Sequence, residues 1–269
     1  RHGWWWWPRF VGLYLVATAA VLVWWRLHPA TALGSLLVLG ILHFGDEDLG
    51  PESEGIRPLR RLARAIGRGS IAVLTPVAAW PNEVAGIFAV LLGMGVAGGV
   101  AGGAAGGEAG LAFWLTDPAA LRLVGLIGLA LAVPAILDAV VTSRRGRGRL
   151  PLVEPVVVLL AGVLLPPVAF FTLYFCLVHA VRHSLRSAAG NVPDRFAGAI
   201  ADFARVTWPA TAVTIVGGVV AGGWLVSGAE VPPVQATLSV VFIGLHALTV
   251  PHVLLALLER RAARPGVRS

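Results

Sequence analysis

The residues best suited to chemistry in this chain are histidines placed within long apolar segments. His179 and His183 lie four residues apart near one end of such a segment. Side chains at positions i and i+4 share one face of a helix, so these two imidazoles can reach one metal ion. His43, His246 and His252 lie at comparable depth in other apolar segments. Ionisable side chains at membrane depth are costly and usually functional, so this set predicts a metal centre.

The composition indicates which elements must position these histidines. Hydrophobic residues make up 57% of the 269 residues, and charged residues only 13%. Apolar stretches recur along the whole chain, which predicts an all-α, polytopic helical bundle in a lipid bilayer. We expect one integral membrane domain over residues 1–269, with no second, soluble domain. At ~20 residues per span, about eight transmembrane helices are expected, over residues 10–26, 30–45, 70–94, 118–142, 152–165, 167–187, 208–228 and 233–258.

The arginines predict how these helices are oriented. They concentrate in the segments after the second, fourth and sixth predicted spans and in the C-terminal tail. These are alternate connections, so the positive-inside rule places them on the cytoplasmic side of the plasma (inner) membrane. A net charge of +7 is thereby explained by short loops and does not indicate nucleic-acid binding. The histidines of three separate helices then lie at similar depth, towards the cytoplasmic side.

Individual residues in this region have alternative interpretations. His246 is interpreted as a packing residue or a support for a ligand, rather than as a ligand. His252 fits metal ligation and a supporting role equally well. The acidic residues 46–48 form a solvated helix end, or else Asp48 accepts a hydrogen bond from the free imidazole N–H of His43, as carboxylates beside metal-bound histidines do. Glu154, at the start of a predicted span, is interpreted as a charge at a helix N-terminus.

The ligand types limit the metal. Several neutral imidazoles without a thiolate suit zinc, copper or iron. Histidines among apolar walls favour a hydrophobic substrate and oxygen chemistry at iron. The residue pattern alone does not name that substrate.

Three short motifs occur in order along the chain. Residues 43–48 read HFGDED, the segment from Pro166 to His183 contains PP, F, YF and HAVRH in that order, and Pro251 precedes His252. These motifs are similar to the HFGxxD, P-P…F…YF…H-x-x-R-H and closing P-H elements of the Brp/Blh family of bacterial and archaeal β-carotene 15,15′-dioxygenases. The resemblance extends from about residue 10 to residue 258.

The resemblance implies an integral membrane enzyme with non-haem Fe(II) held by histidines. Such an enzyme uses O2 to cleave the central double bond of β-carotene and releases two molecules of retinal. Carried over by position, His43, His179 and His183 become iron ligands. His252 becomes a ligand or a supporting residue, and Asp48 supports His43.

The resemblance also suggests how the substrates and products are handled. Phe171, Tyr174 and Phe175 would line the approach of the polyene, although ordinary aromatic packing explains them equally well. The retinal would supply a microbial rhodopsin, which is a partner in the pathway.

One family element is missing. Family members carry an earlier motif similar to P-H-G-A-x-D, whose histidine supplies another ligand, and this chain has no counterpart. Since the chain also starts at Arg1 without a methionine, we expect an N-terminally incomplete sequence that lacks one helix.

Two other classes of protein remain as alternatives. A membrane desaturase or hydroxylase also uses H-x-x-x-H pairs, but it typically needs about eight histidines in several boxes, and this chain has one such pair. A transporter could use intramembrane histidines to conduct protons or metal ions. It would favour paired broken helices in a repeat, which the sequence does not contain.

Overall fold

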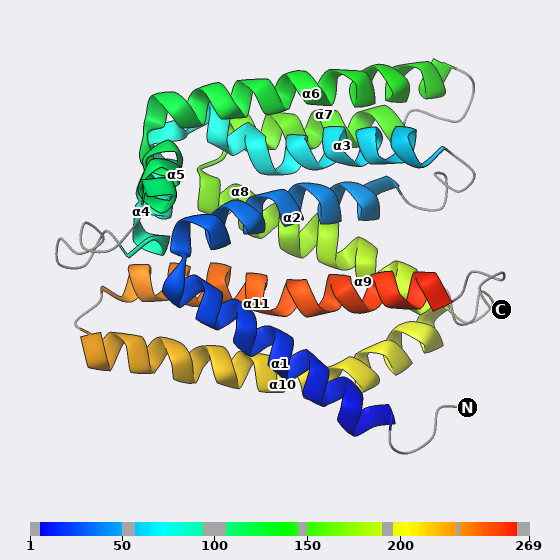
Figure 1. Cartoon of the computed structure of the whole chain (residues 1–269). Helices are drawn as coiled ribbons and strands as arrows, with labels where there is room; N and C mark the ends of the chain where they lie inside the picture. Colours follow the sequence, from blue (N-terminus) through cyan, green and yellow to red (C-terminus); the bar gives the residue numbers. More distant parts are fainter. Residues whose placement is uncertain are drawn as a thin grey trace, which may run out of the picture. The chain divides into compact units, whose positions relative to one another are not determined.

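The computed structural model describes residues 6–49, 57–93, 106–144, 150–189, 196–229 and 232–262, and these residues form helices without any strand (Figure 1). The elements are α1 (Trp6–Leu27), α2 (Pro29–Leu49), α3 (Pro58–Ala79), α4 (Pro81–Leu91), α5 (Gly106–Thr116), α6 (Pro118–Arg144), α7 (Leu150–Leu164), α8 (Pro167–Leu173), the π-helical segment η2 (Tyr174–His179), α9 (Ala180–Ala189), α10 (Phe196–Ala229) and α11 (Pro233–Ala262). The all-α prediction is confirmed.

Proline sets many of the helix starts. Six helices begin at a proline, namely α2, α3, α4, α6, α8 and α11. Proline suits the first helical position because its fixed φ matches the helix and its missing N–H has no intrahelical acceptor there. The sequence therefore encodes these boundaries locally.

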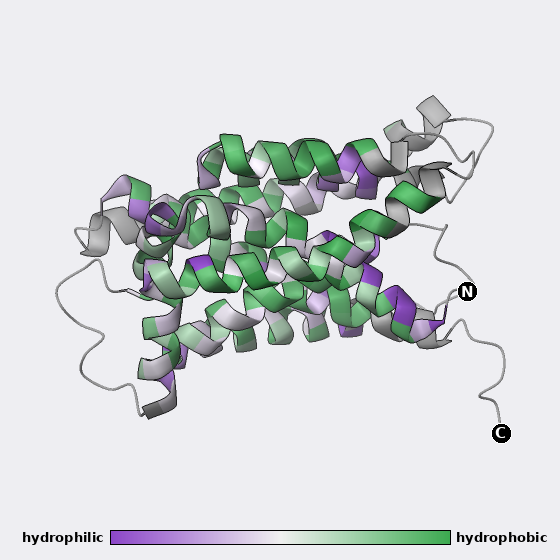
Figure 2. Cartoon of the chain, turned by 90° about the horizontal axis from the view of Figure 1, so that it is seen from above, coloured by the Kyte–Doolittle hydropathy of each residue, from purple (hydrophilic) through white to green (hydrophobic). Residues whose placement is uncertain are grey.

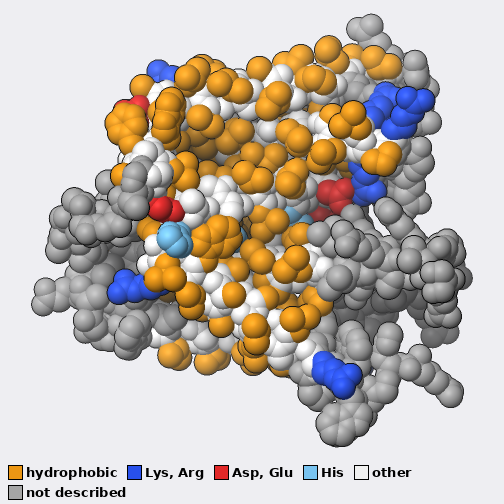
Figure 3. All heavy atoms as spheres, viewed as in Figure 1, with side chains coloured by type: hydrophobic (Ala, Val, Ile, Leu, Met, Phe, Trp, Pro, Cys, Tyr) orange, Lys and Arg blue, Asp and Glu red, His pale blue; other side chains and the backbone are white. Residues whose placement is uncertain are grey.

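The helices are apolar along most of their length. Figure 2 shows green, hydrophobic residues over most of each helix, with purple residues mainly near helix ends. On the face seen in Figure 3, hydrophobic side chains dominate and charged side chains are few. Exposed side chains include Leu13, Leu123 and Val213, at 57%, 52% and 73% exposure. Apolar surface on this scale is what a helical protein presents to lipid.

The predicted count of eight spans is not confirmed. Among the described residues, four helical stretches are long and apolar enough to cross a membrane, or up to five with one bent pair; the four are Pro29–Glu47, Pro118–Leu137, Pro167–Leu185 and Pro233–Leu255. Three further predicted spans correspond to the shorter apolar helices Val11–Leu27, Val153–Leu164 and Thr207–Val220. Each of the eight predicted segments is thus helical, but half of them fall short as straight spans.

The predicted span over residues 70–94 is broken in the middle. Helices α3 and α4 meet at a bend of 103°. Trp80 leaves the helical conformation, with φ −126° and ψ 50°, directly before Pro81. A residue before proline is pushed away from the α region, and this explains the break. Pro76, by contrast, lies inside α3 without ending it.

The chain divides into two compact units. The first contains residues 1–36, 89–112 and 218–269, and the second contains residues 37–88 and 113–217. Each unit is built from segments far apart in the sequence, and the single-domain organisation stays a prediction. In the second unit, α3 packs along both α6 and α7 (Figure 1). Its buried core includes Phe44, Ile71, Ala132, Phe170 and Tyr174.

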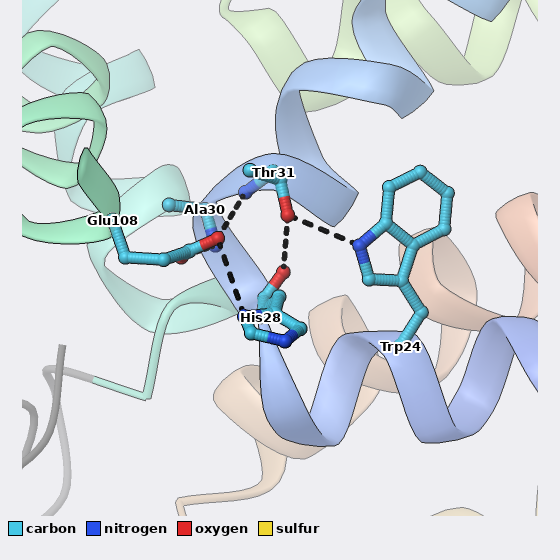
Figure 4. A network of polar contacts seen from close by, with 5 residues as sticks. All are labelled: Trp24, His28, Ala30, Thr31 and Glu108. Atoms are coloured by element: carbon cyan, nitrogen blue, oxygen red, sulfur yellow. Dashed lines mark hydrogen bonds and ion pairs between the residues drawn. The ribbon is translucent and has the colours of Figure 1, made fainter. Parts of the chain in front are cut away.

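In the first unit, a carboxylate holds the start of α2. Glu108 accepts hydrogen bonds from the backbone N–H groups of Ala30 and Thr31, at 3.1 and 3.3 Å (Figure 4). Its other close contact is Nδ1 of His28, at 3.8 Å. The first N–H groups of a helix have no intrahelical partner and favour a negative charge, so Glu108 caps α2 from α5. In the same unit, α1 packs against α11.

Candidate metal centre

The three histidines predicted as ligands lie together in the second unit. His43 comes from α2, His179 ends η2 and His183 lies on α9. The ring centroids of His43 and His179 are 5.2 Å apart, and those of His179 and His183 are 6.3 Å apart. Two imidazoles bound to one ion have centroids roughly 4.5–6 Å apart, because metal–nitrogen bonds are about 2.1 Å long. The first pair falls inside this range and the second just beyond it.

A π-helical segment brings His179 to this position. Residues Tyr174–His179 form the π turn, and the backbone N–H of Ala180 bonds to the carbonyl of Phe175, five residues earlier. Such turns are rare and often occur at functional sites. The wider turn changes the angular phase between the residues before and after it. The spacing of His179 and His183 alone did not reveal this irregularity.

His179 sits at the centre of an aromatic environment. Its side chain is buried at 6% exposure, and its ring lies 4.6 Å from that of Phe44 and 5.7 Å from that of Phe175. Its Nδ1 atom is buried and has no hydrogen-bond partner among the described residues. Buried polar atoms are nearly always satisfied, so an exception at this place needs an explanation. A metal ion beside the imidazoles fits both the donor type and this buried atom.

The ring nitrogens of the three histidines do not point towards one common position. In the part of the chain that the structure describes, no group of three or more His, Cys, Asp or Glu side chains has the arrangement of a metal site. The planes of His179 and His183 are only 15° apart, so these rings stack rather than direct two nitrogens inward. The backbone already places the three residues together, and an imidazole reorients by rotating about its side-chain bonds.

Charged side chains near the histidines contact one another or an imidazole. Oε2 of Glu47 lies 3.5 Å from Nδ1 of His183. One residue earlier, Asp46 accepts a hydrogen bond from Nε of Arg61, at 2.9 Å. On the other side, Arg182 and Glu154 form an ion pair of 2.5 Å that links α9 to α7. From the sequence alone, Glu154 is interpreted only as a helix-end charge, and no role is assigned to Glu47.

The aromatic residues predicted to line the substrate path divide into two groups. Tyr174 is buried at 4% exposure and stacks on Phe170 at 6.0 Å, within the core of the unit. Phe171 and Phe175 stack on each other at 5.7 Å, and both are half-buried. Contact with a polyene stays a prediction for all three predicted residues.

The remaining predicted site residues lie elsewhere or are not described. His246 and His252 belong to the first unit, where His252 is exposed on α11. Asp48 ends the HFGDED motif of residues 43–48, but its side chain lies outside the described residues. The roles of His252 and Asp48 near a metal therefore stay predictions.

His246 is held by a complete hydrogen-bond chain. The indole N–H of Trp25 donates to Nδ1 of His246 at 2.8 Å. The Ser35 hydroxyl donates to the carbonyl of Ala32 at 2.8 Å, so at 3.3 Å it accepts from Nε2 of His246. Because an indole N–H only donates, Nδ1 carries no proton and the neutral Nε2–H tautomer is present. At 1% exposure, His246 joins α1, α2 and α11 in the first unit. A supporting role beside a metal stays a prediction.

This hydrogen-bond chain predicts a large stability effect. His246→Ala removes the acceptor of the Trp25 indole N–H and leaves a buried cavity in place of the imidazole. We therefore expect a loss of about 2–4 kcal/mol in the free energy of unfolding. Thermal unfolding in detergent, followed by intrinsic fluorescence, measures it. The matched control is His28→Ala, because the His28 side chain is 59% exposed. Equal shifts in the two variants would contradict this assignment.

Comparisons with known proteins agree with the motif pattern. The family described as beta-carotene 15,15'-dioxygenase matches residues 1–258. The chain is 29% identical to the probable beta-carotene 15,15'-dioxygenase Blh of Halobacterium salinarum, over 92% of this chain and 72% of that protein. It is 25% identical to the beta-carotene 15,15'-dioxygenase of the uncultured marine bacterium 66A03, over 92% of this chain and 80% of that protein. No solved structure matches.

Proposed function

The chain belongs to the beta-carotene 15,15'-dioxygenase family, and we propose that it cleaves β-carotene at its central double bond. In this reaction both atoms of O2 enter the products: the central C=C bond breaks, and each carbon becomes the aldehyde carbon of one retinal. The observation that carries the proposal is the meeting of His43 with His179 in a buried, aromatic site, with His183 one turn further along.

The proposed metal is Fe(II), held by His43, His179 and His183. When bound, iron would supply the redox chemistry that allows O2 to react with a hydrocarbon. His252 is proposed as a further ligand or a support, and Asp48 and His246 as supporting residues. Neutral imidazoles without thiolate suit iron, and the buried Nδ1 atom of His179 supports a bound ion at this place.

The protein's own contribution is to orient the substrate and exclude water. The wall around His179 is formed by the rings of Phe44 and Phe175, which offer an apolar surface to a polyene. Phe171 and Tyr174 would extend this surface. Holding the central bond beside the reacting oxygen converts a random encounter into an oriented one, which is a major source of rate enhancement.

The proposed location is the plasma membrane, with the metal site towards the cytoplasmic side. The apolar helices support a membrane protein, and the distribution of arginines supports this orientation. β-Carotene would enter from the bilayer in which it dissolves. The retinal released there would supply a microbial rhodopsin.

The test is production of retinal in a bacterium that makes β-carotene. We expect cells that express the chain, together with any upstream coding sequence, to lose carotene colour and accumulate retinal in a molar ratio of two per carotene consumed. Extraction and chromatography measure both compounds, and cells with the His183→Ala variant serve as the control. Unchanged carotene in cells that contain the folded, iron-loaded protein would reject the proposal.

A further inference from the structure

We propose that Glu47 positions His183 for metal binding by accepting a hydrogen bond from its Nδ1 atom. This inference rests on the proposed function, because it assigns Glu47 a role toward the same metal. The structural basis is a pairing in two tiers between α2 and the η2–α9 segment. His43 faces His179 in one tier, and Glu47 faces His183 in the other.

The tiers follow from helical spacing. Glu47 lies four residues after His43 on α2, and His183 lies four residues after His179. Residues at i and i+4 occupy one helix face, so two facing pairs form when these helices lie alongside each other. The contact therefore arises from the backbone arrangement that also brings His43 to His179.

The contact between Glu47 and His183 is partly buried. Oε2 of Glu47 lies 3.5 Å from Nδ1 of His183, and the two side chains are 21% and 36% exposed. Two nearby carboxylates contact arginines: Asp46 pairs with Arg61, and Glu154 pairs with Arg182. Glu47 contacts His183, which is a predicted ligand.

The chemistry of imidazole gives this contact a consequence. In a neutral ring, one nitrogen carries a proton and the other offers a lone pair. A carboxylate that accepts a hydrogen bond from Nδ1–H leaves the Nε2 lone pair of His183 for the metal, and it also fixes the plane of the ring. Carboxylates in this role orient metal-bound histidines and raise their basicity. Glu47 is a positioning residue, because it acts through His183.

The test measures metal affinity with Co(II) as the probe, on the full chain purified in detergent. We expect Glu47→Ala to weaken Co(II) binding about 10- to 100-fold, the range found when such carboxylates are removed. We expect Glu47→Gln to stay within about threefold of the parent, because its amide oxygen still accepts a hydrogen bond from Nδ1–H. The visible absorption of bound Co(II) reports the ligand set and should keep its shape in both variants.

Asp46→Ala is the matched control, since it removes a carboxylate one residue away that pairs with Arg61. Its Co(II) affinity should equal that of the parent. Parent-like affinity in Glu47→Ala would overturn the inference. Equal losses in both Glu47 variants, with an altered absorption spectrum, would also overturn it and make Glu47 a direct ligand.

The outcomes separate this inference from the proposed function. A parent protein that binds Co(II) with the expected pattern of variants, but forms no retinal when loaded with iron, would reject the function and retain the role of Glu47. A parent protein that forms retinal, together with a Glu47→Ala variant that keeps full Co(II) affinity, would reject the role of Glu47 and retain the proposed function. A parent protein without Co(II) binding would overturn both.

Discussion

His179→Ala is expected to remove the bound metal and to lower retinal formation more than about 100-fold, because a lost ligand costs more than the 10- to 100-fold found for supporting residues. His179 is the member of the histidine cluster that touches both others, since its ring lies 5.2 Å from His43 and 6.3 Å from His183. It is also the most deeply buried of the three, so water cannot easily replace its nitrogen.

The decisive measurement combines metal content with product formation. Iron per protein is measured on purified samples, and retinal is measured in carotene-producing cells with equal amounts of folded protein. His28→Ala is the matched control, because His28 is exposed and contacts Glu108 in the first unit. It should keep both iron and activity. A His179→Ala protein that retains full iron content would exclude His179 as a ligand.

The proximity of His43, His179 and His183 was predictable, because it depends on regular features of helices. The four-residue spacing of His179 and His183 put both on one face, and the apolar runs placed His43 at a similar depth. The structure brings all three into one unit. His252 was predicted by the same reasoning, but it belongs to the first unit, and its part in a metal site stays a prediction.

The remaining parts of the site depend on contacts between helices, which a linear pattern does not contain. The π turn before Ala180, over Tyr174–His179, has no distinctive residue signature. The partners of Glu47 and Glu154 lie on other elements, more than a hundred residues and nearly thirty residues away respectively. Glu47 occupies a position that the HFGxxD motif leaves unspecified, yet it contacts His183.

The predicted count of eight spans is not confirmed, for a different reason. Hydropathy identifies apolar helices but does not measure how far each one continues straight. The break at Trp80–Pro81 was foreseeable, because proline restricts the residue before it. Which of two prolines would break the helix was not foreseeable, since Pro76 is accommodated inside α3.

Gly45→Ala is expected to destabilise the second unit severely, although it adds only one methyl group. A Cβ atom at Gly45 would lie 1.8 Å from the backbone carbonyl oxygen of Ala65 on α3. Gly69 shows the reciprocal contact, where a Cβ would lie 1.8 Å from the carbonyl oxygen of Ile41 on α2. Backbone atoms cannot rotate away as side chains do, so the two helices must separate. Overpacking commonly costs about 1–3 kcal/mol, and this contact should reach or exceed the upper value.

This separation should also disable the proposed metal site. Gly45 lies between His43 and Glu47 on α2, so displacing this helix moves both residues away from His179 and His183. The unfolding temperature and the Co(II) affinity, both measured in detergent, should therefore fall together. Gly86→Ala is the matched control, because a Cβ there meets nothing within 4 Å. Alanine at an open helical position is neutral or stabilising by up to about 1 kcal/mol. If Gly45→Ala unfolds at the same temperature as Gly86→Ala, the close approach of α2 to α3 is not what positions His43.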